Sequence, residues 1–94
     1  MADGNIQFEV FPTDLYLSRI DPAQNMRRFY RLTVQHDLFG GVSLIRVWGR
    51  IGTRGRQIVD IHADEGRAIN ALMALAQQKR RRGYGATSHG SYVG

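Results

Sequence analysis

The residues of this chain best suited to binding chemistry lie between Arg46 and Arg56, a stretch with four arginines, the single tryptophan and no acidic residue. On a β-strand, alternate side chains face the same side, so Arg46, Trp48 and Arg50 would share one face. A guanidinium group matches a pair of phosphate oxygens, and an indole ring offers a nucleotide a stacking surface. The stretch therefore predicts a surface that binds a phosphorylated polymer, above all a nucleic acid.

The same stretch ends in a glycine-containing loop, residues 52–56, which has two compatible interpretations. Glycine allows the positive φ of a simple hairpin turn. The loop amides, together with the side chains of Arg54 and Arg56, would also donate hydrogen bonds to phosphate. The glycine spacing does not match a P-loop, so nucleotide hydrolysis is not indicated.

Positive charge is spread unevenly along the 94 residues. The formal net charge is +5 and the pI about 10.4, within the range typical of nucleic-acid-binding domains. Twelve of the thirteen cations are arginine, and a second basic cluster covers residues 79–82. That cluster, which includes Arg80, either extends a phosphate-binding surface or forms a solvated helix end that suits the helix dipole.

Other chemistries find little support in the sequence. Without cysteine the chain forms neither disulfides nor thiolate metal sites. The histidines lack metal-ligand spacing, and no serine or acid is placed for nucleophilic or acid–base catalysis. We therefore expect no catalytic residue, metal, cofactor or small-molecule substrate. The protein is accordingly predicted not to be an enzyme. The sequence shows no membrane-spanning run and no secretory signal, so we expect no membrane partner and a cytoplasmic location.

Alternating apolar residues predict strands over residues 6–11, 15–20, 28–36, 42–51 and 57–62. Helical spacing predicts one long helix over 65–82, with Asp64 as its N-cap and Gly83 just beyond its end. Consecutive strands followed by a helix indicate an α+β fold, an antiparallel sheet of about four to five strands with the helix packed on one face. We expect one domain over 1–85 and a flexible tail over 86–94.

The place of Trp48 on this sheet has two interpretations. A tryptophan in a small domain is often part of the core, but burying the charges of Arg46 and Arg50 beside it without partners would be costly. We therefore expect the helix to cover the other side of that strand and Trp48 to face away from the helix. The side expected to be covered carries Ile45, Val47 and Ile51.

Four ordered landmarks resemble those of the WGR domain family, which is named for its Trp-Gly-Arg triplet. They are Arg-Phe-Tyr-Arg-Leu (28–32), Gly-Gly (40–41), Trp-Gly-Arg-Ile-Gly-Thr (48–53) and Lys-Arg-Arg-Arg-Gly-Tyr (79–84). WGR domains occur in DNA-dependent poly(ADP-ribose) polymerases and as short stand-alone bacterial proteins. The resemblance covers most of the chain and implies a curved antiparallel sheet with one helix across it, in agreement with the elements expected above.

The resemblance also implies roles for particular residues. In the polymerases this domain binds DNA at strand breaks, its tryptophan stacks on the sugar of a terminal nucleotide, and polar and basic residues hold the 5′-phosphate. By position, Trp48 would be the stacking residue, Arg50 would contact phosphate or relay binding to a neighbouring domain, and Tyr84 would be a phosphate partner. Arg27 stands where the polymerases commonly carry an asparagine, so an ionic contact would replace an amide contact there.

The residues and the resemblance together predict a non-catalytic module that binds the backbone or strand ends of nucleic acid, DNA rather than RNA. The predicted site comprises Arg27, Arg46, Trp48, Arg50, Arg54, Arg56, Arg80 and Tyr84. The alternative is a protein-interaction module that docks an acidic protein partner on the same face, because tryptophan and arginine are enriched at interface hot spots.

Overall fold

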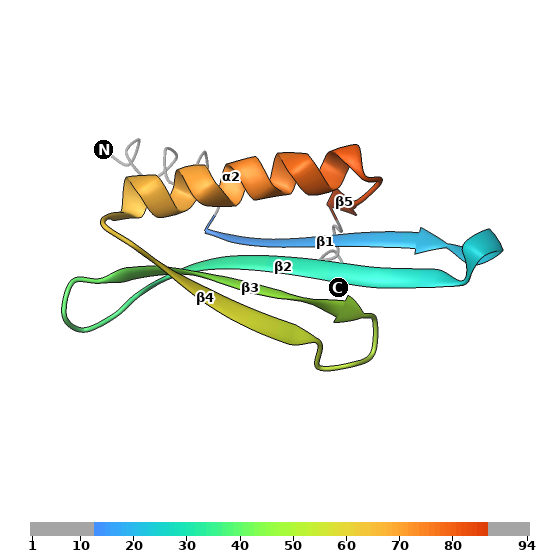
Figure 1. Ribbon diagram of the computed structural model, residues 1–94, viewed down its shortest axis with the longest axis horizontal. Helices are drawn as coiled ribbons and strands as arrows, with labels where there is room; N and C mark the ends of the chain where they lie inside the picture. The colour runs from blue at the N-terminus through green and yellow to red at the C-terminus, as the bar shows by residue number, and fades with distance from the viewer. Residues whose placement is uncertain (1–12, 87–94) are drawn as a thin grey trace, which may run out of the picture.

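The computed structural model describes residues 13–86 and places five strands in one antiparallel sheet, in the order β4-β3-β2-β1-β5. Helix α2 lies across one face of the sheet, and no other described element covers the opposite side, here called the open face (Figure 1). The predicted α+β fold, an antiparallel sheet with a helix packed on one face, is therefore confirmed. The elements are β1 (Asp14–Asp21), η2 (Pro22–Gln24), β2 (Met26–His36), β3 (Val42–Arg50), β4 (Arg56–His62), α2 (Glu65–Arg81) and β5 (Gly85–Ala86).

The central hairpin, formed by β2 and β3, decides which side chains share a face. Asp37 fixes its turn, because the Asp37 Oδ1 accepts hydrogen bonds from the amides of Phe39 at 2.7 Å and Gly41 at 2.8 Å. In the resulting register Tyr30 lies directly opposite Trp48, so the two side chains point to the same side of the sheet. A slip of one residue would send every side chain of β3 to the other side.

Helix α2 begins where the sequence predicts and ends one residue earlier, at Arg81. Asp64 is its N-cap, and the Asp64 Oδ1 accepts a hydrogen bond from the amide of Arg67 at 2.8 Å. Beyond the last turn, Gly83 has a φ of +97°, which glycine adopts without the steric cost that a Cβ would bring. The predicted start of the helix is thus confirmed, and the predicted end is one residue too late because Arg82 is the C-cap.

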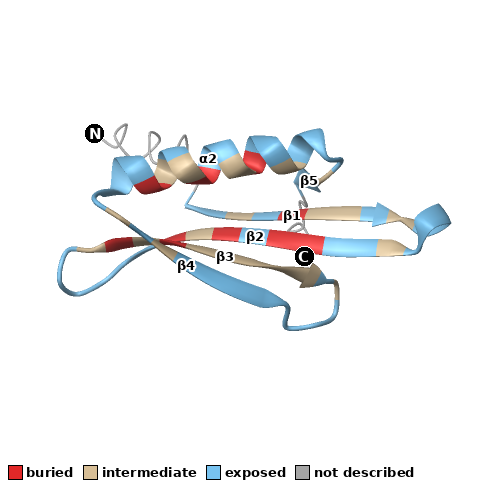
Figure 2. Cartoon of the chain, viewed as in Figure 1, coloured by how far each residue is buried: buried red, intermediate tan, exposed pale blue. Residues whose placement is uncertain are grey.

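The hydrophobic core lies between α2 and the sheet and draws buried residues from both layers (Figure 2). On β3 the covered side carries the buried Val42 and Leu44 and the half-buried Trp48. The prediction that Trp48 faces away from the helix is therefore wrong. β3 has apolar residues on both of its sides, and the covered side is set by pairing with Leu32 and Val34 of β2 rather than by β3 alone.

The same correction applies to the neighbours of Trp48. Strand alternation puts Ile45 and Val47 on the open face, and puts Arg46 and Arg50 on the side of α2. The expected cost of burying Arg46 is offset by a partner on β4, because the Arg46 Nε lies 2.9 Å from the Asp60 Oδ2. Arg46 was expected to have no partner if it were buried, but the strand register brings Asp60 beside it.

Two predictions fall on the ends of the chain. The strand expected over 6–11 lies outside the described residues, as does 87–94 of the expected tail. Ala86, where that tail was expected to begin, belongs instead to β5, which pairs with Leu17 and Ser18 of β1. Within residues 13–86 no helix is long and apolar enough to cross a membrane. Nor does any group of three or more His, Asp or Glu in this range gather closely enough to hold a metal ion.

Candidate nucleic-acid interface

A cleft of about 280 Å³ opens where the last turn of α2 meets the sheet. Three aromatic rings and four cations line it, and no acid among the described residues does. Because like charges held together repel one another, this arrangement favours an anionic ligand. The residues that line this basic cleft are Arg19, Met26, Arg28, Tyr30, Trp48, Lys79, Arg82 and Tyr84.

The three rings of the basic cleft pack on one another. The Trp48 ring stacks on Tyr30 with centroids 5.7 Å apart and an interplanar angle of 16°. Tyr84 meets the same Tyr30 ring edge-on, at 6.4 Å and 81°. Tyr30 is buried, whereas Trp48 and Tyr84 are half-buried, so the outer two rings keep surface that a ligand can contact. Such stacked contacts fix ring orientation before any ligand binds.

Tyr84 reaches the cleft because the chain reverses directly after α2. Gly83 turns the backbone, and the amide of Tyr84 donates to the carbonyl of Lys79 at 3.1 Å. The next two residues then form β5 beside β1, which holds the reversed segment against the sheet. The Gly-Tyr pair after the basic cluster therefore positions an aromatic side chain rather than only ending the helix.

Lys79 is the cation closest to the rings. Its Nζ lies 4.4 Å from the centroid of Tyr30 and 5.9 Å from that of Tyr84, within the range of a cation–π interaction. Burial lowers the pKa of the Lys79 ammonium, and the positive charges of Arg82 and Arg46 lower it further. A phosphate bound beside Lys79 would stabilise its charged form. It would accept hydrogen bonds that burial has taken from water, and it would offset the repulsion from the nearby arginines.

Three arginines form a row across neighbouring strands on the side of α2. Arg19 of β1 pairs with Arg28 of β2, and Arg28 pairs with Arg50 of β3. Like charges directly opposite each other destabilise a sheet, so this row lowers stability unless a ligand neutralises it. Within residues 13–86 the hydrogen bonds of the Arg50 guanidinium are long, 3.4 Å to the Asn25 carbonyl and 3.5 Å to its Oδ1.

Steric contacts explain why the middle residue of the Trp-Gly-Arg triplet is glycine. A Cβ on Gly49 would lie 2.8 Å from the Cα of Gly55, and a Cβ on Gly55 would overlap the carbonyl oxygen of Trp48. The Phe29 ring lies beneath, 3.0 Å from that same Gly55 position. The loop between β3 and β4 therefore folds back against the triplet, which fixes the backbone that carries Trp48 and Arg50.

The structure brings part of the predicted site together. Trp48 and Tyr84 line the basic cleft, and Arg50 belongs to the arginine row beside it. Arg56 lies directly opposite Trp48 on β4, on the same side of the sheet, and is exposed. Arg46 is on that side too, but its guanidinium group already forms an ion pair with Asp60.

Three predicted site residues lie elsewhere. Strand alternation directs Arg27 to the open face, away from the cleft. Arg54 is exposed in the loop between β3 and β4, outside the lining of the cleft. Arg80 lines a separate hollow with Leu72 and Gln77, on another side of α2.

The four cations of the lining were not identified individually from the sequence, namely Arg19, Arg28, Lys79 and Arg82, and neither Met26 nor Tyr30 was predicted as a site residue. Lys79 and Arg82 belong to the basic cluster whose place relative to Trp48 depends on how α2 crosses the sheet. Arg28 could have been found, because counting back from the Gly-Gly turn pairs it with Arg50 and pairs Tyr30 with Trp48. Arg19 has no comparable local signal, since it depends on the register of a second hairpin.

Comparisons with known proteins identify the family of the chain. The WGR domain matches residues 13–91 of the chain. A relative in Sinorhizobium fredii (strain NBRC 101917 / NGR234), named "Uncharacterized protein y4dW", is 44% identical over 73 residues. That match covers 78% of this chain but 36% of the relative, so the chain spans about a third of the relative's length. No solved structure matches the chain. With the triplet, the basic cluster and the whole described sheet inside the matched range, the chain belongs to the WGR domain family.

Proposed function

We propose that the basic cleft binds the sugar-phosphate backbone of nucleic acid, DNA in preference to RNA, and that the domain is not itself catalytic. Membership in the WGR family supports a nucleic-acid-binding module in general. The observation that carries the finer proposal is the lining of the cleft, in which stacked aromatic rings and four cations meet without an acid among the described residues. Rings and guanidinium groups at one place serve sugars or bases and phosphates at once.

The proposed division of labour follows from position. Trp48 offers the free part of its half-buried ring to a sugar or base, while Tyr30 supports it from beneath. Lys79, Arg28 and Arg82 bind phosphate from around the rings. Arg50 and Arg56 extend the positive surface along β3 and β4. Nothing in this arrangement reads base edges, so binding is expected to depend little on sequence.

The experiment that tests the proposal measures fluorescence anisotropy with labelled duplexes that carry a 5′-phosphate or a 5′-hydroxyl at a blunt end, at two salt concentrations. Wild-type protein should bind with a log affinity that falls by about 0.9 per neutralised phosphate for each unit of log salt. Trp48→Ala should weaken binding by about 1–3 kcal/mol. Arg67→Gln, at the other end of α2, is a control for the loss of one positive charge outside the cleft and should bind nearly like wild type.

Because Trp48 is the single tryptophan, its intrinsic emission gives a second readout without any label. Stacking on a sugar or base should change the emission of wild-type protein on titration with unlabelled DNA. Absence of binding at low salt, or binding that is equal in wild type and Trp48→Ala, would contradict the proposal. Equal affinity for the two duplex ends would restrict it to backbone binding without end preference.

A second candidate function uses the same cleft for an acidic protein partner. The observation in its favour is that four cations around half-buried rings would accept clustered carboxylates as well as phosphates. The two functions are distinguished by which ligand the cleft binds, a DNA duplex or an acidic peptide. A DNA duplex that fails to bind, while a glutamate-rich peptide with an aromatic anchor binds in a Trp48-dependent manner, would favour the protein partner.

A further inference from the structure

The open face of the sheet is unusually apolar for a surface that no described element covers. In antiparallel sheets with one solvated face, that face normally carries polar residues. Here the outward positions of β3 carry Ile45 and Val47, and those of β4 carry Val59 and Ile61, which are 47% and 74% exposed. Uncovered apolar surface of this kind marks an interaction site.

The hairpin between β2 and β3 adds two apolar side chains at the end of this face. Leu38 and Phe39 are 95% and 94% exposed. The backbone that carries them is nonetheless fixed, because the Asp37 Oδ1 accepts from the amides of Phe39 and Gly41, and the Gly41 carbonyl accepts from the amide of Asp37 at 3.0 Å. A turn that is fixed in advance presents its side chains to a partner at low entropic cost.

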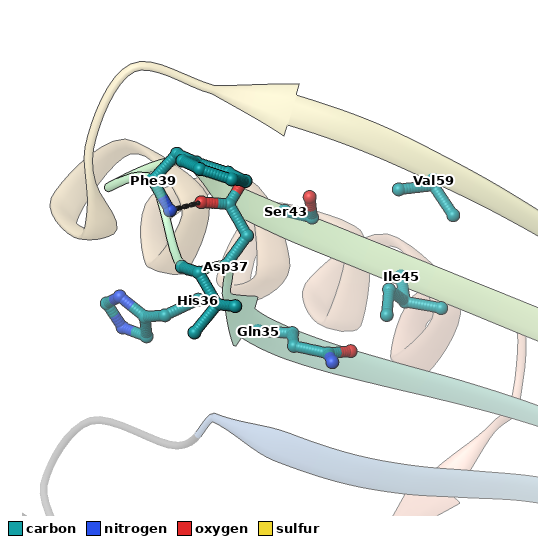
Figure 3. A pocket seen from close by; sticks show the side chains of 8 residues that line it. Gln35, His36, Asp37, Phe39, Ser43, Ile45 and Val59 are labelled. Atoms are coloured by element: carbon teal, nitrogen blue, oxygen red, sulfur yellow. Dashed lines mark hydrogen bonds between the residues drawn. The ribbon is translucent and has the colours of Figure 1, made fainter.

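A hollow of about 560 Å³ lies directly beside this turn. Figure 3 shows Ile45 and Val59 on neighbouring strands along the hollow, with Phe39 at its hairpin end. Gln35 and Ser43 add uncharged polar groups along the strands, and His36 and Asp37 lie at the hairpin end of the hollow. Leu38 and Phe39 themselves form part of its wall. One surface of the molecule thus carries an exposed apolar pair and, next to it, a mainly apolar hollow that can receive such a pair from another molecule.

We propose that a second copy of this chain covers the open face, with Leu38 and Phe39 of each copy seated in the hollow of the other. A twofold interface needs one patch that is complementary to itself, and a protrusion beside a matching hollow meets that need. Its central residues are uncharged, as in the apolar core of homodimer interfaces.

Charge also favours a second copy over other partners. The net charge is +5, but the cations of the basic cleft lie on the opposite side of the sheet, so two copies can approach without bringing those clefts together. On the open face Arg31 is already paired with Asp14, at 2.8 Å. An anionic partner, whether nucleic acid or an acidic protein, would meet the Asp37 carboxylate in the hollow and no arginine or lysine among the described residues that line it.

The dimer would leave the basic cleft of each copy free, since the clefts lie on the side of α2. Two clefts in one particle would raise the apparent affinity for a long nucleic acid through effective concentration. This consequence rests on the proposed function, whereas dimerisation itself does not. The two are separated by measuring self-association without nucleic acid.

The test measures molar mass by sedimentation equilibrium from about 10 μM to about 1 mM, a range chosen to detect modest affinities. Wild-type protein should approach the mass of a dimer. The double variant Leu38→Ser/Phe39→Ser should raise the dissociation constant by more than about tenfold, because both anchors are lost. Met73→Ser removes an exposed apolar side chain of α2, 48% exposed, and should leave the dimer unchanged.

Disulfide trapping adds a geometric test, because the native chain contains no cysteine. A Phe39→Cys protein mixed with a Val59→Cys protein should form a mixed disulfide on mild oxidation, faster than either forms one with Met73→Cys. A wild-type protein that stays monomeric throughout the range overturns the proposal, as does a dimer that survives the double serine variant. Dimerisation that appears only after deletion of residues 1–12 also overturns it, since that segment would then occupy the face.

Discussion

The two faces of the sheet are built from the same strands and have opposite chemistry. On the side of α2, β3 presents Trp48 to a cleft lined by cations and rings, with Arg50 beside that cleft. On the open face the same strand presents Ile45 and Val47, and Ile45 lines a hollow whose walls are mainly apolar. One face therefore suits an anion, and the other suits an apolar surface.

This division also separates two kinds of cost. The row Arg19–Arg28–Arg50 places like charges opposite each other, which lowers folding stability and is relieved by an anionic ligand. The open face instead leaves apolar side chains in water, which association relieves. Charge repulsion on the side of α2 favours an anionic ligand. Exposed apolar surface on the open face favours an apolar partner. Substitutions can be chosen to disturb both faces, one face or neither.

The largest effect is expected at Gly55, which lies against the backbone of Trp48 and the ring of Phe29. Gly55→Ala would place a Cβ against the Trp48 carbonyl and 3.0 Å from the Phe29 ring, at a φ of +78°. We expect a loss of about 1–3 kcal/mol in the free energy of unfolding, measured by urea denaturation. Gly52→Ala is the matched control, since its φ is +96° but no atom lies within 4 Å of the added Cβ. Equal losses in the two variants would mean that the close approach contributes nothing.

The next effect concerns the cleft alone. Lys79→Met keeps much of the side-chain length and removes the charge over Tyr30. Nucleic-acid affinity should fall about tenfold, the value of one hydrogen bond to a charged group. Because burial lowers the pKa of Lys79 below 10.5, affinity of the wild type should also decline as pH rises through that lowered pKa. Anisotropy titrations between neutral and alkaline pH should show this decline in wild type and a flatter profile in Lys79→Met.

A smaller effect sharpens the contrast between the faces with two adjacent arginines. Arg28 lines the basic cleft, and alternation directs Arg27 to the open face. Arg28→Gln should reduce the slope of log affinity against log salt by about one. Arg27→Gln should leave that slope unchanged. A lowered slope in Arg27→Gln would restore the position suggested by the polymerases and contradict the division between faces.

Local signals in the sequence predicted much of this fold. The Asp64 cap, the helical spacing and Gly83 define α2, because each acts within a few residues of its own position. The alternating strands and the Gly-Gly turn likewise follow from local backbone preferences. These features needed no knowledge of what packs against them.

The arrangement of the site depended on contacts between distant residues. Trp48 was assigned to the wrong side because β3 is apolar on both sides and only its pairing with β2 decides between them. Arg46 was expected to be free because nothing local shows that Asp60 lies beside it. Lys79 was part of a known cluster, but its place over Tyr30 depends on the angle at which α2 crosses the sheet. Sequence spacing alone therefore did not predict the strand register or the way in which α2 packs on the sheet.

The smallest expected effect is on the open face, at the ion pair of Asp14 with Arg31. Hydrogen bonding from Arg31 lowers the pKa of Asp14 below 3.8, with the charge of Arg31 and a hydrogen bond from Thr33 acting in the same direction. A carboxylate whose pKa is lower in the folded state stabilises the fold above its unfolded pKa and loses that effect as pH falls through its folded pKa. Both partners are about half exposed, so Asp14→Asn should cost only about 0.2–1 kcal/mol at neutral pH.

Urea denaturation of wild type and Asp14→Asn at neutral pH and at a pH of about 2 checks this expectation, because the stability difference should shrink towards zero in acid. Binding of nucleic acid should be the same in the two proteins at neutral pH, since the pair lies on the side of the sheet away from the basic cleft. If Asp14→Asn instead changed the salt dependence of binding, charge on the open face would be coupled to the cleft. The two faces would then have to be treated as one electrostatic surface.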